Sequence, residues 1–156
     1  MARENEKIRE FARALPVAED QGFSKWAVFT HAWHESGAFK KVIGSHNYWG
    51  IKKPRKWTGK THIVTTHEYI KGEKTKVQAE FIDFGTAIEA VNWYCGLIRR
   101  IYPGSYRNRH EPARYFVHLV SGKLKYATDP NYPTKLISLY RVLYEDSNLA
   151  FLIDHE

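Results

Sequence analysis

A strand–turn–strand pattern in the middle of this 156-residue chain constrains its fold more than any other feature. Residues 62–70 and 76–84 are rich in β-branched and aromatic side chains, and Lys71-Gly72-Glu73 between them suits a tight turn. In the second run, apolar side chains recur at every other position, as on a half-buried strand. We therefore predict a β-hairpin over this stretch.

Helical patterns flank the hairpin on both sides. Ser24 suits the N-cap of a helix that Gly37 would end, and Thr86-Ala87-Ile88-Glu89 has the residues of a capping box. Asp129-Pro130 combines an N-cap residue with proline at the first helical position. The predicted helices span about residues 4–21, 25–36, 86–102, 112–120 and 129–144.

The order of these elements predicts one small α+β domain over residues 1–156. No internal repeat, low-complexity tract or Gly/Ser-rich linker interrupts the sequence. A hairpin set between helices leaves a cleft where an extended ligand can lie.

Charge, hydropathy, cysteine content and histidine spacing limit the classes of protein to which this chain can belong. The net charge of +7 favours anionic partners but does not separate nucleic acid from a negatively charged cell envelope. No apolar run approaches the roughly 20 residues of a membrane helix. Cys95 is the only cysteine, so no intrachain disulfide forms, and its apolar neighbours predict a buried, inert thiol. The histidine spacings match no zinc motif, so we expect neither a metal nor a cofactor.

Glu35 is the first candidate catalytic residue. Trp26, Phe29 and Ala32 form an apolar arc on the predicted helix, and Glu35 falls at the edge of this arc near the helix end. Apolar surroundings and the negative end of the helix dipole both favour a protonated carboxyl group. A protonated carboxylic acid near neutral pH is what the cleavage of a glycosidic bond requires. An ordinary exposed glutamate in a last helical turn is the alternative.

Aromatic residues make up 15% of the chain, a content high enough to suggest that some of the rings bind a ligand as well as fill the core. Flat rings stack on sugar faces, and an amide side chain bonds to sugar hydroxyl groups. The candidates for saccharide binding are Asn47, Tyr48, Trp49, Tyr69 and Tyr132, with Trp57 as a weaker one. For Trp26, Trp33, Phe81 and Trp93 we expect core positions.

Four short motifs carry a family resemblance. They are Glu35-Ser36-Gly37, Asn47-Tyr48-Trp49-Gly50-Ile51-Lys52, Thr65-Thr66-His67-Glu68-Tyr69 and Tyr126-Ala127-Thr128-Asp129-Pro130-Asn131-Tyr132. In this order, over roughly residues 8–144, the chain resembles the peptidoglycan-cleaving glucosaminidases of glycoside hydrolase family 73. The resemblance implies a lysozyme-like fold, in which a mainly helical lobe and a small β-hairpin lobe flank a substrate cleft.

The resemblance also implies roles for three residues. Glu35 would be the general acid, Glu68 the second carboxylate on the hairpin, and Tyr126 a neighbour of the acid in the active site. By pattern alone Glu68 could equally be a solvent-facing strand residue. Family members often continue Glu-Ser-Gly with Trp-Gly, whereas this chain has Ala38-Phe39, which bears on the shape of the sugar subsites.

The implied function is endo-acting β-1,4-N-acetylglucosaminidase activity on the glycan strands of bacterial peptidoglycan, by a monomer without a cofactor. An N-acetylmuramidase or a lytic transglycosylase on the same fold remains open, as does a non-catalytic glycan-binding module. A nucleic-acid-binding domain would explain the charge, but no helix-turn-helix, zinc-finger or RNP pattern supports it.

Residues 1–13 are charged and lack the apolar segment of a secretory signal. We therefore expect a protein made in the cytoplasm, without membrane insertion, that reaches the cell wall through a holin or a virion. This is the setting of a phage endolysin or virion lysin.

Overall fold

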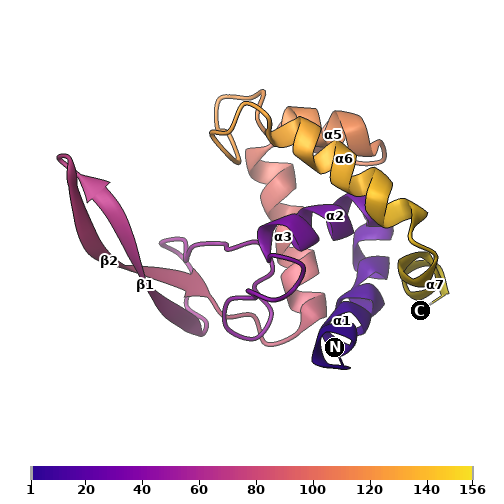
Figure 1. The fold of residues 1–156 in the computed structure, drawn as a ribbon, viewed down its shortest axis with the longest axis horizontal. Coiled ribbons are helices and arrows are strands. Elements are labelled where there is room, and N and C mark those ends of the chain that lie inside the picture. Colours follow the sequence, from indigo (N-terminus) through magenta and orange to yellow (C-terminus); the bar gives the residue numbers. More distant parts are fainter. Residues whose placement is uncertain (1, 156) are drawn as a thin grey trace.

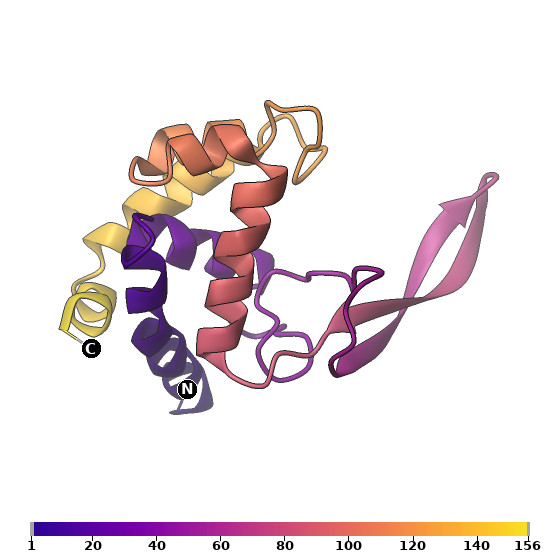
Figure 2. The same cartoon turned by 180° about the vertical axis from the view of Figure 1, so that it is seen from behind.

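The computed structural model describes residues 2–155, and their side chains from residue 5 onwards. Within this range a helical body carries a projecting two-stranded hairpin (Figure 1), and the reverse view shows the same arrangement (Figure 2). The predicted α+β architecture is confirmed. The elements are α1 (Ala2–Glu19), α2 (Lys25–Glu35), β1 (Thr61–Ile70), β2 (Glu73–Ile82), α3 (Ala87–Ile101), α4 (Pro103–Arg107), α5 (Pro112–His118), α6 (Tyr132–Glu145) and α7 (Ser147–His155).

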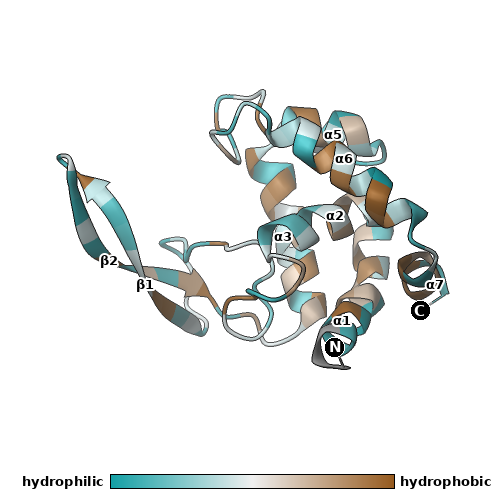
Figure 3. Ribbon diagram, viewed as in Figure 1, coloured by the Kyte–Doolittle hydropathy of each residue, from teal (hydrophilic) through white to brown (hydrophobic). Residues whose placement is uncertain are grey.

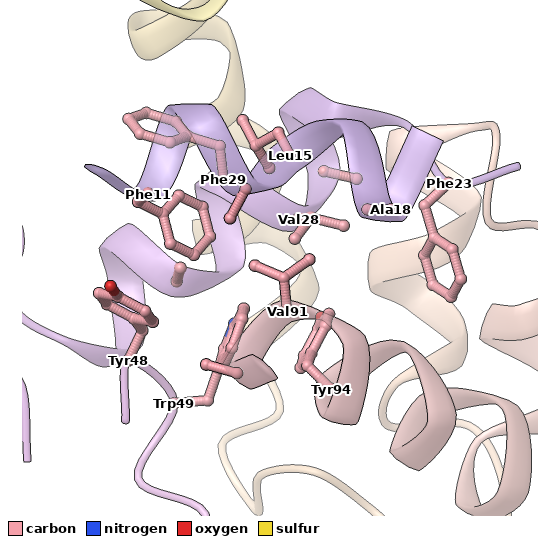
Figure 4. Close-up of a cluster of buried hydrophobic side chains, with 14 of the residues drawn as sticks. Phe11, Leu15, Ala18, Phe23, Val28, Phe29, Tyr48, Trp49, Val91 and Tyr94 are labelled. Carbon is pink, nitrogen blue, oxygen red and sulfur yellow. The ribbon is translucent and has the colours of Figure 1, made fainter. Parts of the chain in front are cut away.

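Helix α2 lies at the centre of the helical body. Seven consecutive residues, from Trp26 to Ala32, are buried, so the buried surface of α2 extends well beyond the apolar arc predicted from the sequence. The reason is that α1, α5 and α6 all pack against this short helix. Figure 4 shows Val28 and Phe29 of α2 among side chains of α1 and α3. Each large apolar side chain buried in this way contributes about 1.5–3 kcal/mol by leaving water.

The hairpin is antiparallel, in a register that runs from Thr61 opposite Ile82 to Ile70 opposite Glu73. Its turn has two residues rather than the three predicted. Lys71 and Gly72 have φ angles of 52° and 81°, as a tight turn that follows the strand twist requires.

The base of the hairpin is joined to the body through the loop after residue 50. The amide of Ile82 donates to the Ile51 carbonyl at 3.1 Å, and the amide of Lys53 donates to the Glu80 carbonyl at 2.9 Å. The outer part is largely hydrophilic (Figure 3), and its residues near the turn are exposed. The hairpin is therefore anchored at one end only.

Both predicted N-caps that involve a hydroxyl group are confirmed. Ser24 Oγ accepts from the Ala27 amide at 3.2 Å, and Thr86 Oγ1 accepts from the Glu89 amide at 3.0 Å. The short helix α4 and the terminal helix α7 were not predicted. None of the described helices is long and apolar enough to cross a lipid bilayer.

The start of α6 differs from the prediction. This helix begins at Tyr132, not at Asp129-Pro130. The Asp129 carboxylate accepts from the Asn131 amide at 2.9 Å and from Lys135 Nζ at 2.6 Å. It thus closes a local turn before the helix, a competing use of an aspartate near a helix start.

Candidate active site

Glu35 is the last residue of α2, and its side chain is 24% exposed. Its Oε1 accepts a hydrogen bond of 2.7 Å from the Tyr132 hydroxyl group. No protein partner for Oε2 is found among the described residues. The carboxyl group thus has one oxygen bound to the helical body and one available to a ligand.

Glu35 lines a cleft of about 560 Å³. The end of α2, the loop after Tyr48, α3 and the segment before α6 all contribute to its wall. The lining residues are Glu35, Trp49, Gly50, Ile51, Lys52, Pro54, Trp93, Leu97, Tyr102 and Tyr126. A carboxyl group set among aromatic rings in an open cleft suits a sugar chain, whose ring faces are apolar and whose linkages need a proton to break.

Tyr126 lies in the same cleft as Glu35. Its ring packs edge-on against the buried His31 ring, with centroids 4.4 Å apart, and its hydroxyl group donates a long 3.4 Å bond to the Trp49 carbonyl. Burial, followed by the nearby charge of Glu35, holds the pKa of Tyr126 well above its usual value. Tyr126 therefore presents a neutral hydroxyl group with spare bonding capacity beside the acid.

Tyr132 differs from its predicted role. It was expected to stack on a sugar, but only 3% of its surface is exposed, and its hydroxyl group bonds to Glu35 instead. Burial raises the pKa of Tyr132, and the charge of Glu35 adds to the effect, so the hydroxyl group keeps its proton as a donor. Tyr132 supports the acid from behind.

The prediction that Asn47 and Tyr48 bind sugar is not supported by their positions, because both side chains are buried. The Asn47 amide group donates to the carbonyls of Ile51 and Ile82, each at 2.9 Å, and accepts from the Ile51 amide at 2.9 Å. It therefore holds the loop to the base of the hairpin.

Tyr48 and Trp49 belong to the aromatic core (Figure 4). Tyr48 packs on Phe11 with ring centroids 4.8 Å apart. Trp49 is 3% exposed, yet it forms part of the cleft wall. Of the Asn47-Tyr48-Trp49 run, only Trp49 can therefore meet a ligand, and with only a small part of its ring.

Glu68 and Tyr69 lie in the outer part of the hairpin, away from Glu35. Glu68 pairs with Thr75 close to the turn, and both Glu68 and Tyr69 are exposed. Neither residue lines the cleft that contains Glu35. The described structure does not bring the two carboxylates together, so the role of Glu68 stays a prediction that requires the hairpin to bend towards the body.

Two aromatic cleft residues were not identified from the sequence. Trp93, expected in the core, is half-buried and lines the cleft, with the guanidinium group of Arg100 5.5 Å above its ring. Tyr102 lies between α3 and α4, and its ring centroid is 5.5 Å from that of Tyr126. Arg100 follows Trp93 by seven positions, so both lie on one face of α3. This spacing is a weak sequence signal that Trp93 is partly exposed. Tyr102 has none.

A left-handed turn follows the acid. Gly37, Ala38 and Phe39 have φ angles of 58°, 59° and 65°. For a residue with a Cβ atom this conformation costs roughly 1–2 kcal/mol. It is held by a 2.9 Å bond from the Phe39 amide to Ser36 Oγ and by the buried Phe39 ring, whose centroid is 5.3 Å from that of Phe11. The Ala38-Phe39 departure thus fixes how the chain leaves Glu35.

The described residues contain no group of three histidine, cysteine, aspartate or glutamate side chains that could hold a metal ion. Cys95 is buried in α3, and burial raises the pKa of its thiol to about 12. The predicted burial of the thiol is confirmed.

Comparison with known proteins gives one family for nearly the whole chain. Residues 12–145 match the Glucosaminidase model, described as mannosyl-glycoprotein endo-beta-N-acetylglucosaminidase. The peptidoglycan hydrolase FlgJ of Salmonella typhimurium is 30% identical over 138 residues, which cover 81% of this chain and 42% of that protein. FlgJ of Escherichia coli K12 is 33% identical over 134 residues, which cover 79% of this chain and 41% of that protein. The chain thus spans about two fifths of the length of these relatives.

Solved structures share the fold. A C-terminally truncated glycoside hydrolase domain of Salmonella typhimurium FlgJ has a TM-score of 0.75 and 27% identity, covering 92% of this chain and 99% of that domain. The catalytic domain of the autolysin Auto from Listeria monocytogenes has a TM-score of 0.73 at 20% identity, covering 96% of this chain and 86% of that domain. The second likeness concerns the fold alone.

Proposed function

The chain belongs to the glucosaminidase family, and from this membership we propose that it hydrolyses the glycan strands of bacterial peptidoglycan as an endo-β-1,4-N-acetylglucosaminidase. The observation that carries the proposal is the Glu35 carboxyl group. It ends a buried helix, lines an aromatic cleft, and has one oxygen bound to Tyr132 and the other without a protein partner.

In this proposal Glu35 is the general acid. It donates its proton to the glycosidic oxygen as the bond to the anomeric carbon breaks, so the leaving sugar departs as an alcohol rather than an alkoxide. The rings of Trp93 and Tyr102 hold sugar faces along the cleft.

Two routes can supply the attacking group. In the first, Glu68 activates a water molecule or attacks directly, and the hairpin must bend at its base so that Glu68 approaches the cleft. In the second, the 2-acetamido group of the substrate attacks the anomeric carbon, and the Tyr126 hydroxyl group orients that amide. The position of Tyr126 in the same cleft as Glu35, with Glu68 outside that cleft, favours the second route.

Analysis of the reaction products tests the proposed bond specificity. Purified sacculi are digested, and the released muropeptides are reduced with borohydride and identified by mass spectrometry. We expect N-acetylglucosaminitol at the new ends. N-acetylmuramitol would mean a muramidase, and a 1,6-anhydro end would mean a lytic transglycosylase. No release by the well-folded protein would mean a non-catalytic glycan-binding module.

We further propose that the enzyme acts as a phage endolysin or virion lysin that reaches the wall after release from the cytoplasm or from a virion. The net charge of +7 supports this role, because it attracts the protein to an anionic envelope. Expression inside bacteria, with and without a co-expressed holin, tests the proposal. Lysis only with the holin supports it, and lysis without the holin contradicts it.

A further inference from the structure

Behind Glu35, four buried side chains form a continuous series of hydrogen bonds across four helices. Tyr115 of α5 meets Tyr94 of α3 at 2.5 Å between hydroxyl oxygens, and Tyr94 meets His31 Nδ1 at 2.6 Å. His31 Nε2 lies 2.8 Å from the Tyr132 hydroxyl oxygen, which in turn bonds to Glu35 Oε1 at 2.7 Å. We call Tyr115, Tyr94, His31 and Tyr132 the donor network.

The direction of these bonds is fixed from both ends. At one end, the Tyr132 hydroxyl group donates its single hydrogen to Glu35 Oε1, so His31 must donate to Tyr132 from Nε2. At the other end, the Tyr115 hydroxyl group is buried and has no described partner except Tyr94. Its hydrogen is satisfied only if it donates to Tyr94, which then donates to His31 Nδ1. A reversed network would leave a buried hydroxyl hydrogen without an acceptor, at a cost of about 1–3 kcal/mol.

His31 is suited to this role because it is neutral. Burial, with a smaller effect from His34, lowers the pKa of His31 to about 3. The 3.9 Å approach of His31 Nε2 to Glu35 is therefore not an ion pair at neutral pH. Other titratable groups around the carboxyl group are Tyr132 from α6, Tyr126 from the preceding loop, and His34 on α2, which lies against the Tyr132 ring. Lys52 and Tyr102 line the same cleft.

We propose that His31 is a positioning residue for Glu35: its Nε2–H group holds the Tyr132 hydroxyl group so that this group donates to Oε1, which reserves Oε2 for the catalytic proton. The inference rests on the proposed function, because it assigns a role around the general acid. A carboxylic acid whose Oε1 already accepts a hydrogen bond carries its proton on the other oxygen, which has no described protein partner. Tyr94 and Tyr115 act further back by selecting the tautomer of His31.

Two replacements of His31 separate positioning from mere support. His31→Gln can present an amide N–H group near the position of Nε2, whereas His31→Asn reaches only the position of Nδ1. We expect His31→Gln to keep kcat within about threefold of wild type, and His31→Asn to lose about tenfold or more, the range of a hydrogen bond to a charged group. Equal loss of kcat and of melting temperature in the two variants would overturn the proposal.

The pH profile gives a readout that a structural role would not move. Tyr132→Phe removes the donor to the ionised carboxyl group, so the alkaline limb of kcat should move to higher pH by about one unit or more. Tyr140→Phe, on the same helix and outside the cleft, is the matched control and should leave the limb unchanged. An unmoved limb in a folded Tyr132→Phe protein would overturn the proposal.

Nitrogen-15 NMR of the wild-type imidazole tests the network without any turnover. We expect the tautomer with hydrogen on Nε2 and none on Nδ1 at pH 7. The opposite tautomer, or an imidazolium ion, would overturn the inference even if the enzyme is active. Conversely, an inactive protein with the expected tautomer would refute the proposed function and leave the network as described.

Discussion

The indole ring of Trp49 lies flat on the phenol ring of Tyr94, with centroids 4.0 Å apart and planes 8° apart. Trp49 forms part of the cleft wall, and Tyr94 is fully buried and bonds to His31. One aromatic layer thus separates the ligand cleft from the donor network behind Glu35. In a water-excluded setting of this kind, the hydrogen bonds that orient an acid are stronger than in solution.

Replacement of the acid tests its assignment. We expect Glu35→Gln to lower wall-lytic activity by about 10²–10⁴-fold, the range that general acid catalysis supplies. The glutamine carbonyl oxygen can still accept from Tyr132, so the melting temperature should stay close to wild type. Turbidity loss of sacculi and thermal unfolding measure the two effects. Retention of half the activity would refute the assignment.

Tyr126→Phe should lower turnover more than stability. The hydroxyl group makes only one long bond, to the Trp49 carbonyl, so its removal should cost less than about 1 kcal/mol of unfolding free energy. Steady-state kinetics on a soluble glycan fragment and urea unfolding provide the comparison. A tyrosine with only a structural role would give parallel losses in both measurements.

Glu68→Gln tests whether the hairpin bends towards the body during catalysis. If Glu68 supplies the second carboxylate, activity should fall sharply with no change in melting temperature, because the side chain is exposed. Glu73→Gln, an exposed glutamate at the start of β2 on the same hairpin, should keep full activity. Full activity in both variants would instead favour attack by the substrate acetamido group.

Asn47→Ala should destabilise the protein as a whole. The change removes the Asn47 bonds to the Ile51 amide and to the Ile82 carbonyl, whereas the Ile51 carbonyl keeps its bond from the Ile82 amide. An unsatisfied buried group costs about 1–3 kcal/mol, so a loss of at least 2 kcal/mol in urea unfolding is expected. A sugar-binding role alone would raise KM and leave the unfolding midpoint unchanged.

Acid should weaken the fold through His31. The pKa of this buried side chain is lowered from 6.5 to about 3, so between these values the unfolded chain binds the proton more readily than the folded protein does. The contribution of the neutral His31 ring to the free energy of unfolding is complete above pH 6.5. It declines as the pH falls towards 3, by up to about 1.4 kcal/mol per pH unit. Urea unfolding at several pH values should show a shallower decline for His31→Gln. Identical slopes would contradict this reasoning.

Local signals in the sequence determined much of the fold. Ser24 and Thr86 cap their helices, and the hairpin follows from β-branched runs on either side of Lys71-Gly72, because capping and turn chemistry act between residues only a few positions apart. The placement of Glu35 at a helix end follows from the same kind of evidence. The family motifs predicted a substrate cleft with Glu35 in its wall, as the structure has it, but not which motif residues face that cleft.

Only the tertiary structure decided which side chains surround the acid. The Tyr132–Glu35 bond joins residues 97 positions apart, and the His31–Tyr94 bond joins residues 63 apart. Periodicity and capping carry no information at such separations. Burial of Asn47 and Tyr48, exposure of Trp93 to the cleft, and the donor network all depend on which helix faces pack together. The packing of the whole core determines which helix faces meet, and this packing sets which buried polar groups lie within hydrogen-bonding distance of each other.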